Sequence, residues 1–247
     1  MNELINKNIS VFLPAYNEEE NIKATVLAVN NYLKTRFKDY EILVVSEGSI
    51  DRTNEIVADL QKDIKEIKLF TKKKCFGYAG ALRTGFLNST KELIFYTDAD
   101  QQFDINDLDK LLPWIGQYDI ITGFKIKRQD AVTRKFTSWV YNTTMRIVFG
   151  LKLRDINCAF KLYKREVIEK INFLSNLTEG VINAEVYLTA LKNGYIIREI
   201  GINHFPRKTG LPVSQLGTRR FVFVKPIIIY RFFKDTVRLW IKEHKTR

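Results

Sequence analysis

Cysteine, histidine and proline are all scarce in this sequence of 247 residues, which contains two, two and five of them respectively. Two cysteines are too few for a disulfide framework, so we expect a protein of a reducing, cytosolic environment. Two histidines argue against a zinc site, because imidazole is one of the main ligands of zinc. The rest of the composition, 45% hydrophobic and 28% charged residues, is that of a globular domain.

Long apolar runs are also missing. No stretch free of Asp, Glu, Lys and Arg exceeds ten residues, whereas a helix that crosses a bilayer needs about 20 predominantly apolar residues. The first residues, Met1 to Lys7, hold no apolar segment of signal-peptide length. The sequence therefore predicts neither a membrane-spanning helix nor a cleaved leader.

Positive charge is in excess and is concentrated at one end of the chain. Lysine and arginine number 40 against 28 aspartates and glutamates, which gives a formal net charge of +12. Eleven of the basic residues and only two of the acidic ones lie within residues 207–247. A segment of this kind predicts an anionic partner. A membrane surface is the favoured interpretation, and nucleic acid is the alternative.

Short apolar runs alternate with segments of helical spacing over the first half of the chain. We expect strands at Ile9–Pro14, Tyr40–Val45, Ile67–Phe70, Leu93–Thr97 and Asp119–Thr122. We expect helices at Glu18–Phe37, Arg52–Lys62, Gly77–Asn88 and Ile105–Ile115. Strands that alternate with helices predict an α/β fold, with a mainly parallel sheet and helices on both faces.

The pattern changes after Gly123, where helical segments dominate. We expect helices at Val132–Gly150, Arg165–Ile171 and Asn183–Asn193, followed by a strand at Tyr195–Ile200. From about Ile227 a last helix has five cations on one side and four apolar residues on the opposite side. The cations are Arg231, Lys234, Arg238, Lys242 and Lys245, and the apolar residues are Ile229, Phe233, Val237 and Trp240. This pattern indicates attachment to a membrane surface, while packing on the chain's own domain or on a dimer partner is the alternative.

Polar segments follow several of the expected strands, where open α/β sheets bind their ligands. The sequence has neither the G-x-G-x-x-G fingerprint nor a P-loop. Asp98 and Asp100 follow the strand Leu93–Thr97. In extended chain they point to the same side, roughly 6.6 Å apart. Such carboxylates can share one hard cation, Mg²⁺ or Mn²⁺, whose shell is often completed by substrate phosphates. The alternative is an acidic turn that caps a helix.

Four segments in this order resemble glycosyltransferase family 2: Pro14–Glu18, Glu47–Thr53, Gly77–Gly85 and Asp98–Gln102. Arg154–Lys161 and His204–Gly210 resemble its polyprenyl-phosphate sugar synthase branch. The resemblance implies a GT-A fold, with a catalytic domain over residues 1–216 and a basic helical tail over 217–247. It also implies a GDP-mannose or UDP-glucose type of donor, Mg²⁺ or Mn²⁺ and a polyprenyl phosphate acceptor. Together with the basic tail, it leads us to expect no nucleic acid partner and a cytoplasmic protein that the tail attaches peripherally to a membrane.

The resemblance also implies roles for individual residues. The donor would be bound by Pro14, Ala15, Tyr16, Glu18, Val45, Glu47, Asp98, Ala99 and Lys125. The metal would be held by Asp98, Asp100 and Gln102, the acceptor phosphate by Arg134, Lys161 and Arg207, and catalysis would rest on Asp100, Arg134 and Arg207. Two positions depart from the family pattern: Ser46-Glu47 replaces Asp-Asp, and Lys125 replaces arginine.

The acceptor decides whether a general base is needed. A hydroxyl must lose a proton, whereas a phosphate monoester, with a second pKa near 6, is already largely ionised at neutral pH. The many cations after Gly123 favour a phosphate acceptor. Two alternatives stay open: a family relative acting on a saccharide hydroxyl, with Glu185 or Asp155 as base, and a basic membrane or nucleic-acid binding module without catalysis.

Overall fold

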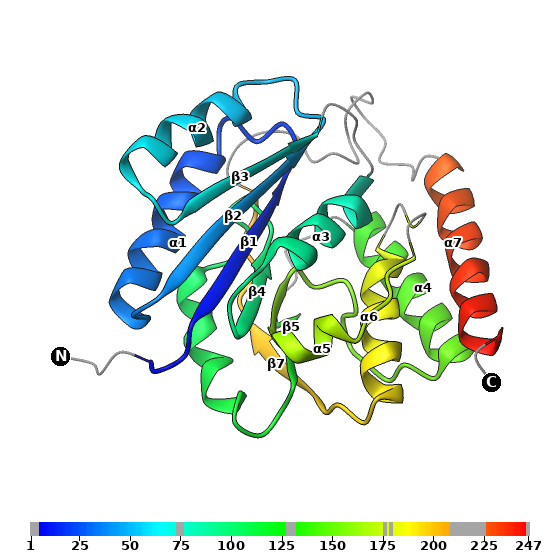
Figure 1. The fold of residues 1–247 in the computed structure, drawn as a ribbon. Coiled ribbons are helices and arrows are strands. Elements are labelled where there is room, and N and C mark those ends of the chain that lie inside the picture. Colours follow the sequence, from blue (N-terminus) through cyan, green and yellow to red (C-terminus); the bar gives the residue numbers. More distant parts are fainter. Residues whose placement is uncertain are drawn as a thin grey trace.

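A computed structural model describes residues 5–72, 77–126, 132–174, 177, 180–207 and 226–245. Among these residues one sheet of seven strands has the order β3-β2-β1-β4-β6-β5-β7 (Figure 1). Its strands are β1 (Ile9–Ala15), β2 (Tyr40–Glu47), β3 (Ile67–Lys72), β4 (Leu93–Thr97), β5 (Ile120–Lys125), β6 (Phe160–Lys164) and β7 (Ile197–Ile202). Strand β6 runs antiparallel to β4 and β5, and the other pairings are parallel.

The central strands are buried on both faces, which explains why their sequences are continuously apolar. Val11 and Leu13 of β1 pack into one core cluster, and Phe12 between them packs into the other. Successive side chains of a strand point to opposite faces, so one strand supplies both cores. The expected α/β architecture with a mainly parallel sheet is confirmed.

Helices cover both faces of this sheet (Figure 1). On one face lie α1 (Ile22–Arg36) and α2 (Thr53–Asp63). The second core is formed by α3 (Gly77–Asn88), α4 (Val132–Phe149), α5 (Arg165–Glu169), α6 (Val181–Lys192) and α7 (Pro226–Lys245). Within the described part of the chain no helix is long and apolar enough to cross a membrane.

Three local expectations differ from the structure. Residues 105–115 form two 3₁₀ segments, η1 (Ile105–Lys110) and η2 (Leu112–Trp114), instead of one α-helix. Pro113 lies at the start of η2 and lacks the N–H that a continuous helix would use. Helix α1 begins four residues after Glu18. Strand β6 lies within a segment to which the sequence pattern assigned no element.

Helix α7 packs against α6 and has three distinct sides. Leu239 is fully buried in the second core, and Asp235 and Glu243 are buried beside it. Phe233 and Trp240 are exposed on another side. The expected boundary at 216–217 and the side chains of Ile229 and Lys245 lie outside the described residues, so the division into two parts stays a prediction.

Candidate active site

The carboxyl ends of the parallel strands meet at one edge of the sheet, and the segments that follow them are tied together. Asn17, with a φ of +53°, donates its N–H to Ser49 Oγ (3.1 Å) beyond β2. Glu18 N donates to Thr53 Oγ1 (2.8 Å). Thr25 Oγ1 of α1 donates to the carbonyl of Ala99 (2.9 Å). These bonds hold the loops after β1, β2 and β4 in one fixed arrangement, and they explain why Glu18 belongs to the site and not to α1.

Asp98 and Asp100 lie together after β4, as expected. Burial raises the pKa of Asp98, and the nearby Asp100 carboxylate raises it further, while Arg134 and Lys125 act in the opposite direction. Burial also raises the pKa of Asp100. The turn is completed by Gln101, with a φ of +59°. Two desolvated carboxylates that repel each other gain from a nearby positive charge.

Cations from three distant segments face these carboxylates. Arg207 forms ion pairs with Glu18 (Nη2 to Oε2, 2.6 Å) and with Asp100 (Nη1 to Oδ2, 3.5 Å). Lys125, at the end of β5, lies 3.9 Å from a carboxylate oxygen of Asp155 and 6.0 Å from the ring centroid of Phe103. Arg134 near the start of α4 is exposed and lowers the pKa of both aspartates. Three of the cations that follow Gly123 in the sequence, Lys127, Arg128 and Lys208, lie outside the described residues.

The donor set suits a hard divalent cation. Asp98 and Asp100 offer carboxylate oxygens, which Mg²⁺ and Mn²⁺ prefer. Gln102 is buried, and its Nε2 donates to the carbonyl of Phe205 (3.1 Å), so its amide also ties the acidic turn to the segment before Arg207. Among the described residues no group of three or more His, Cys, Asp or Glu could hold a metal. A metal held by Asp98 and Asp100 would complete its shell with other oxygens, such as those of substrate phosphates.

The residues expected to line the nucleotide lie along this edge with different exposures. Pro14 and Tyr16 are partly buried, whereas Ala15 and Val45 are buried in the strands. Glu47 is also buried, and its Oε1 accepts from Lys72 Nζ (2.6 Å) and Thr84 Oγ1 (2.7 Å). Glu47 is thus engaged with β3 and α3.

Lys161 lies in the core and does not face the open edge. Its side chain is fully buried, and Nζ donates to Tyr96 Oη (3.0 Å), the Ile156 carbonyl (2.8 Å) and Asn183 Oδ1 (2.8 Å). An ammonium has three N–H groups, so direct contact with an acceptor phosphate, as implied by the resemblance, does not fit this arrangement. Burial lowers the pKa of Lys161 to about 7. Lys161 instead fixes the loop that carries Asp155 to strand β4.

The two candidate bases have different surroundings. Glu185 of α6 faces α7: its Oε1 accepts from Lys242 Nζ (2.7 Å) and Leu174 N (2.8 Å). Asn183, two residues earlier on α6, faces Tyr96 of β4 instead (2.9 Å). The engagement of Glu185 with Lys242 and Leu174 favours a structural role, and its candidate role as a base stays a prediction. Asp155 is buried near Lys125, and in the described part of the chain its Oδ2 has no hydrogen-bond partner.

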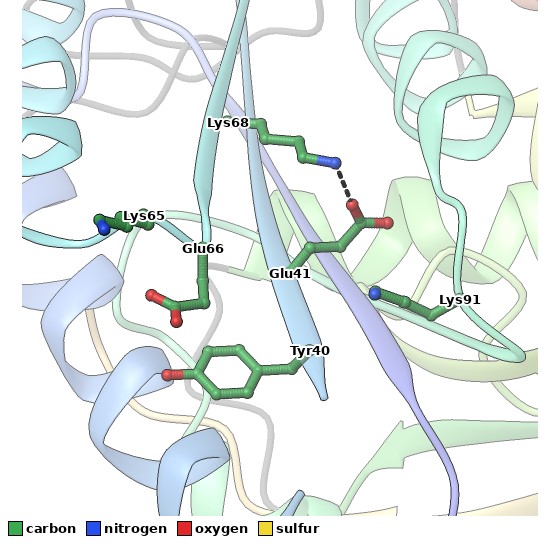
Figure 2. A pocket seen from close by; sticks show the side chains of 6 residues that line it. All are labelled: Tyr40, Glu41, Lys65, Glu66, Lys68 and Lys91. Carbon is green, nitrogen blue, oxygen red and sulfur yellow. Dashed lines mark hydrogen bonds and ion pairs between the residues drawn. The ribbon is translucent and has the colours of Figure 1, made fainter. Parts of the chain in front are cut away.

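A separate pocket of about 220 Å³ opens at the opposite edge of the sheet, beside the amino ends of β2 and β3 (Figure 2). It is lined by Tyr40, Glu41, Lys65, Glu66, Lys68 and Lys91. Burial favours a higher pKa for Glu41, but hydrogen bonds from Lys68, Ser10 and Thr90 outweigh it and lower the pKa to about 2. The Glu41 carboxylate is fully engaged, so we interpret this pocket as the surroundings of the ion pair between the buried Glu41 and the half-exposed Lys68 (2.6 Å) at the end of the sheet.

The family to which the chain is similar is identified by a match over about two thirds of its length. The sequence model of glycosyl transferase family 2 matches residues 10–172. The undecaprenyl-phosphate 4-deoxy-4-formamido-L-arabinose transferase of Pectobacterium carotovorum is 26% identical over 90% of this chain and 64% of its own length. The dolichyl-phosphate beta-glucosyltransferase of Trichomonas vaginalis is 29% identical over 78% of this chain and 64% of its own length. The chain thus spans less than two thirds of the length of these relatives.

Solved structures support the expected fold. Glucosyl-3-phosphoglycerate synthase from Mycobacterium tuberculosis, in complex with Mn²⁺, UDP and glucosyl-3-phosphoglycerate, superposes with a TM-score of 0.67 at 15% identity. The match covers 96% of this chain and 80% of that one. The same enzyme with Mg²⁺ and UDP gives a TM-score of 0.67 at 13% identity, over 94% of this chain and 80% of that one. The GT-A architecture expected from the sequence is confirmed.

Proposed function

The chain belongs to glycosyl transferase family 2, and from this premise we propose that it transfers a hexose from a nucleotide-diphosphate sugar to a polyprenyl phosphate. One observation carries the proposal: the paired carboxylates Asp98 and Asp100 are faced by Lys125, Arg134 and Arg207 at a single sheet edge. The relatives named above, whose names specify undecaprenyl and dolichyl phosphates, support the same class of acceptor.

Asp98 and Asp100, with the amide of Gln102 beside them, would hold Mg²⁺ or Mn²⁺ against the donor diphosphate. Bound there, the cation would neutralise the charge that develops on the leaving diphosphate. Lys125 would bind phosphate oxygens of the donor, and the backbone around Ala15, Val45 and Ala99 would contact the nucleotide. Tyr16, partly exposed at this edge, would pack against the base.

The acceptor phosphate would be held by Arg134 and Arg207. A phosphate with a second pKa near 6 attacks without a general base, so positive charge and alignment suffice. The engagement of Glu185 with Lys242 supports this arrangement, because it occupies one of the two candidate bases. A saccharide hydroxyl acceptor is the second candidate, since the buried Asp155 Oδ2, without a hydrogen-bond partner among the described residues, is available as a base.

A donor panel tests the function. Purified protein is incubated with Mn²⁺, a polyprenyl phosphate and radioactive UDP- or GDP-sugars, and transfer is scored as radioactivity in the organic phase. We expect transfer with one donor, its loss in EDTA, and a loss on the order of 10²-fold or more in Asp100→Ala, as when a strong charge-stabilising group is removed. Asp155→Asn should retain activity if the acceptor is a phosphate. Full activity in EDTA would exclude the metal role, and a strict need for Asp155 would favour the hydroxyl acceptor.

We further propose that α4 and α7 hold the protein on an anionic membrane surface. The two helices touch through Tyr141 and Phe232, whose ring centroids lie 5.3 Å apart. Both present exposed large apolar side chains, namely Phe136, Trp139, Phe233, Val237 and Trp240. Basic residues that lie beside them, such as Lys135 and Lys234, each contribute about 1 kcal/mol near an anionic leaflet.

Point variants test this attachment better than deletion of residues 217–247, because deletion also removes Leu239 from the core. Phe233→Ser with Trp240→Ser should sediment with anionic liposomes at least tenfold less than wild type, since each buried apolar side chain contributes roughly 1.5–3 kcal/mol. Leu87→Ser, at a comparably exposed position on α3, is the control and should bind as wild type. Equal sedimentation of all three proteins would contradict the proposal.

A further inference from the structure

The guanidinium of Arg207 spans two carboxylates that come from different strand ends. Its Nη2 lies 2.6 Å from Glu18 Oε2, after β1, and its Nη1 lies 3.5 Å from Asp100 Oδ2, after β4. Glu18 Oε2 also accepts from Asn21 Nδ2 (2.8 Å). The side chains of Arg207 and of both carboxylates are largely buried, at 13%, 8% and 12% exposure, so water screens these contacts weakly.

The approach of Arg207 to this position is fixed by its own segment. Phe205 N donates to the carbonyl of Gln102 (2.9 Å), and Gln102 Nε2 donates back to the carbonyl of Phe205 (3.1 Å). Two reciprocal bonds therefore hold the backbone just before Arg207 against the acidic turn. The fold places Arg207 beside Asp100, although the two residues are 107 positions apart in the chain.

Asp100 is also one of the two carboxylates that suit a divalent cation. A dication at Asp98 and Asp100 would bring two positive charges close to the guanidinium, and like charges at this range in a desolvated site repel strongly. The ion pair of Arg207 with Asp100 and the binding of a dication therefore oppose each other. A planar guanidinium that is released from a carboxylate can bind a phosphate through two parallel N–H···O hydrogen bonds.

We propose that Arg207 is a resident counter-cation of Glu18 and Asp100, which a divalent cation displaces from Asp100 and thereby frees to bind the acceptor phosphate. This inference rests on the proposed function for the identity of the acceptor. It makes binding ordered, with the metal and nucleotide first and the acceptor second. Because the ion pair of Arg207 and the metal compete for Asp100, a substitution that weakens this ion pair strengthens metal binding.

The test uses Mn²⁺ alone, without donor or lipid, and measures free Mn²⁺ by electron paramagnetic resonance. Arg207→Met should bind Mn²⁺ more tightly than wild type, by roughly the 5- to 150-fold typical of coupled sites. Arg207→Lys keeps the charge and should stay within about threefold of wild type on the same scale. Arg36→Met is the matched control, because Arg36 pairs with Asp109 (3.0 Å) on the surface. Arg207→Gln replaces the methionine variant if the latter does not fold.

A second titration follows the acceptor side with geranyl phosphate as the probe, by calorimetry. Wild type should bind it at least five times more tightly in the presence of Mn²⁺ with UDP or GDP than in their absence, and Arg207→Met should lose this increase. Three results would each overturn the inference. The first is equal Mn²⁺ affinity in wild type and Arg207→Met, and the second is an equal increase in Mn²⁺ affinity in the methionine and lysine variants. The third is an affinity for geranyl phosphate that does not depend on Mn²⁺ and nucleotide. The Mn²⁺ titration involves no sugar or lipid, so its outcome is independent of the donor panel that tests the function.

Discussion

Replacing Lys242 with methionine should destabilise the protein, although Lys242 lies on helix α7 and far along the chain from Asp98 and Asp100. Its ammonium lies 2.7 Å from Glu185 Oε1 and 2.6 Å from the carbonyl of Asn172. The Glu185 side chain is 0% exposed. Without Lys242, among the described residues only Leu174 N (2.8 Å) would still donate to this carboxylate. A buried charge would then remain without its partner.

The magnitude follows from the burial of the two groups. Removal of one partner from a fully buried ion pair costs roughly 3–5 kcal/mol. Lys242 is 22% exposed, so water can partly replace the ammonium, and we expect a loss of about 2–3 kcal/mol in the free energy of unfolding. For a chain of this length each kcal/mol shifts Tm by about 2–4 °C, so the variant should melt several degrees lower.

The pH dependence identifies the cause. Burial raises the pKa of Glu185, while the hydrogen bond and charge of Lys242 act in the opposite direction. In Lys242→Met the pKa should rise further. A carboxyl whose pKa is raised by folding takes up a proton in the folded state first, so acidification through that pKa stabilises the fold relative to the unfolded chain. The deficit of the variant should therefore shrink as pH falls from 8 towards 5.

Urea unfolding at several pH values measures these differences. The double variant Glu185→Gln with Lys242→Met should recover most of the lost stability, because the amide carries no charge to leave unpaired. Lys234→Met, at an exposed position of the same helix, is the control and should stay within about 0.5 kcal/mol of wild type. A deficit that is independent of pH, or that persists undiminished in the double variant, would show that Lys242 acts through packing alone.

Two further predictions concern the opposite edges of the sheet. Burial and the neighbouring Asp100 raise the pKa of Asp98, so Asp98→Asn should stabilise the metal-free protein at pH 8 by roughly 1–3 kcal/mol. The same substitution should abolish the stabilisation that Mn²⁺ gives to wild type. Thermal melts with and without Mn²⁺ measure both effects. The buried Glu41 accepts bonds from the buried Ser10 and the exposed Thr90, so Glu41→Gln should lose roughly 1–3 kcal/mol at pH 7. Hydrogen bonds lower the pKa of Glu41 to about 2. The stability that Glu41 gives to wild type is therefore fully present above the pKa of Glu41 in the unfolded chain, and it declines as pH falls towards 2. Acid titration of the two proteins measures this decline, and equal acid stability would contradict the prediction.

The sequence predicted the strands and the acidic turn because both signals are local. A continuous apolar run such as Leu93–Thr97 can be buried only as a central strand or as the interior of a helix, and five residues are too few for the latter. The rule that ligands bind beyond the carboxyl ends of strands then selects Asp98 and Asp100 without further information. The depth of burial that raises their pKa values could not be inferred, because it depends on the packing of other segments.

Other features depend on contacts between distant residues and have no local signal. Arg207 meets Glu18 across 189 positions of the chain, and no spacing or periodicity predicts that pair. Strand β6 runs antiparallel between β4 and β5, so no βαβ pattern announces it. Lys161 on β6 resembles any other cation of the basic second half, yet the strand order places it between Tyr96 and Asn183 in the core.

Helix α7 shows how a correct periodicity can leave the packing undecided. The sequence separates a basic side from an apolar side, and either could have faced the rest of the protein. The structure buries a third side, where Leu239 is accompanied by the polar Asp235, Thr236 and Glu243. Glu243 is neutralised by Lys192 of α6 (2.5 Å), so a charged residue becomes acceptable at a buried position. Because Asp235 and Glu243 take the inner side, Phe233 and Trp240 are left exposed on a helix that also exposes Arg231 and Lys234, and such an exposed apolar side with cations near it is what a membrane surface can bind.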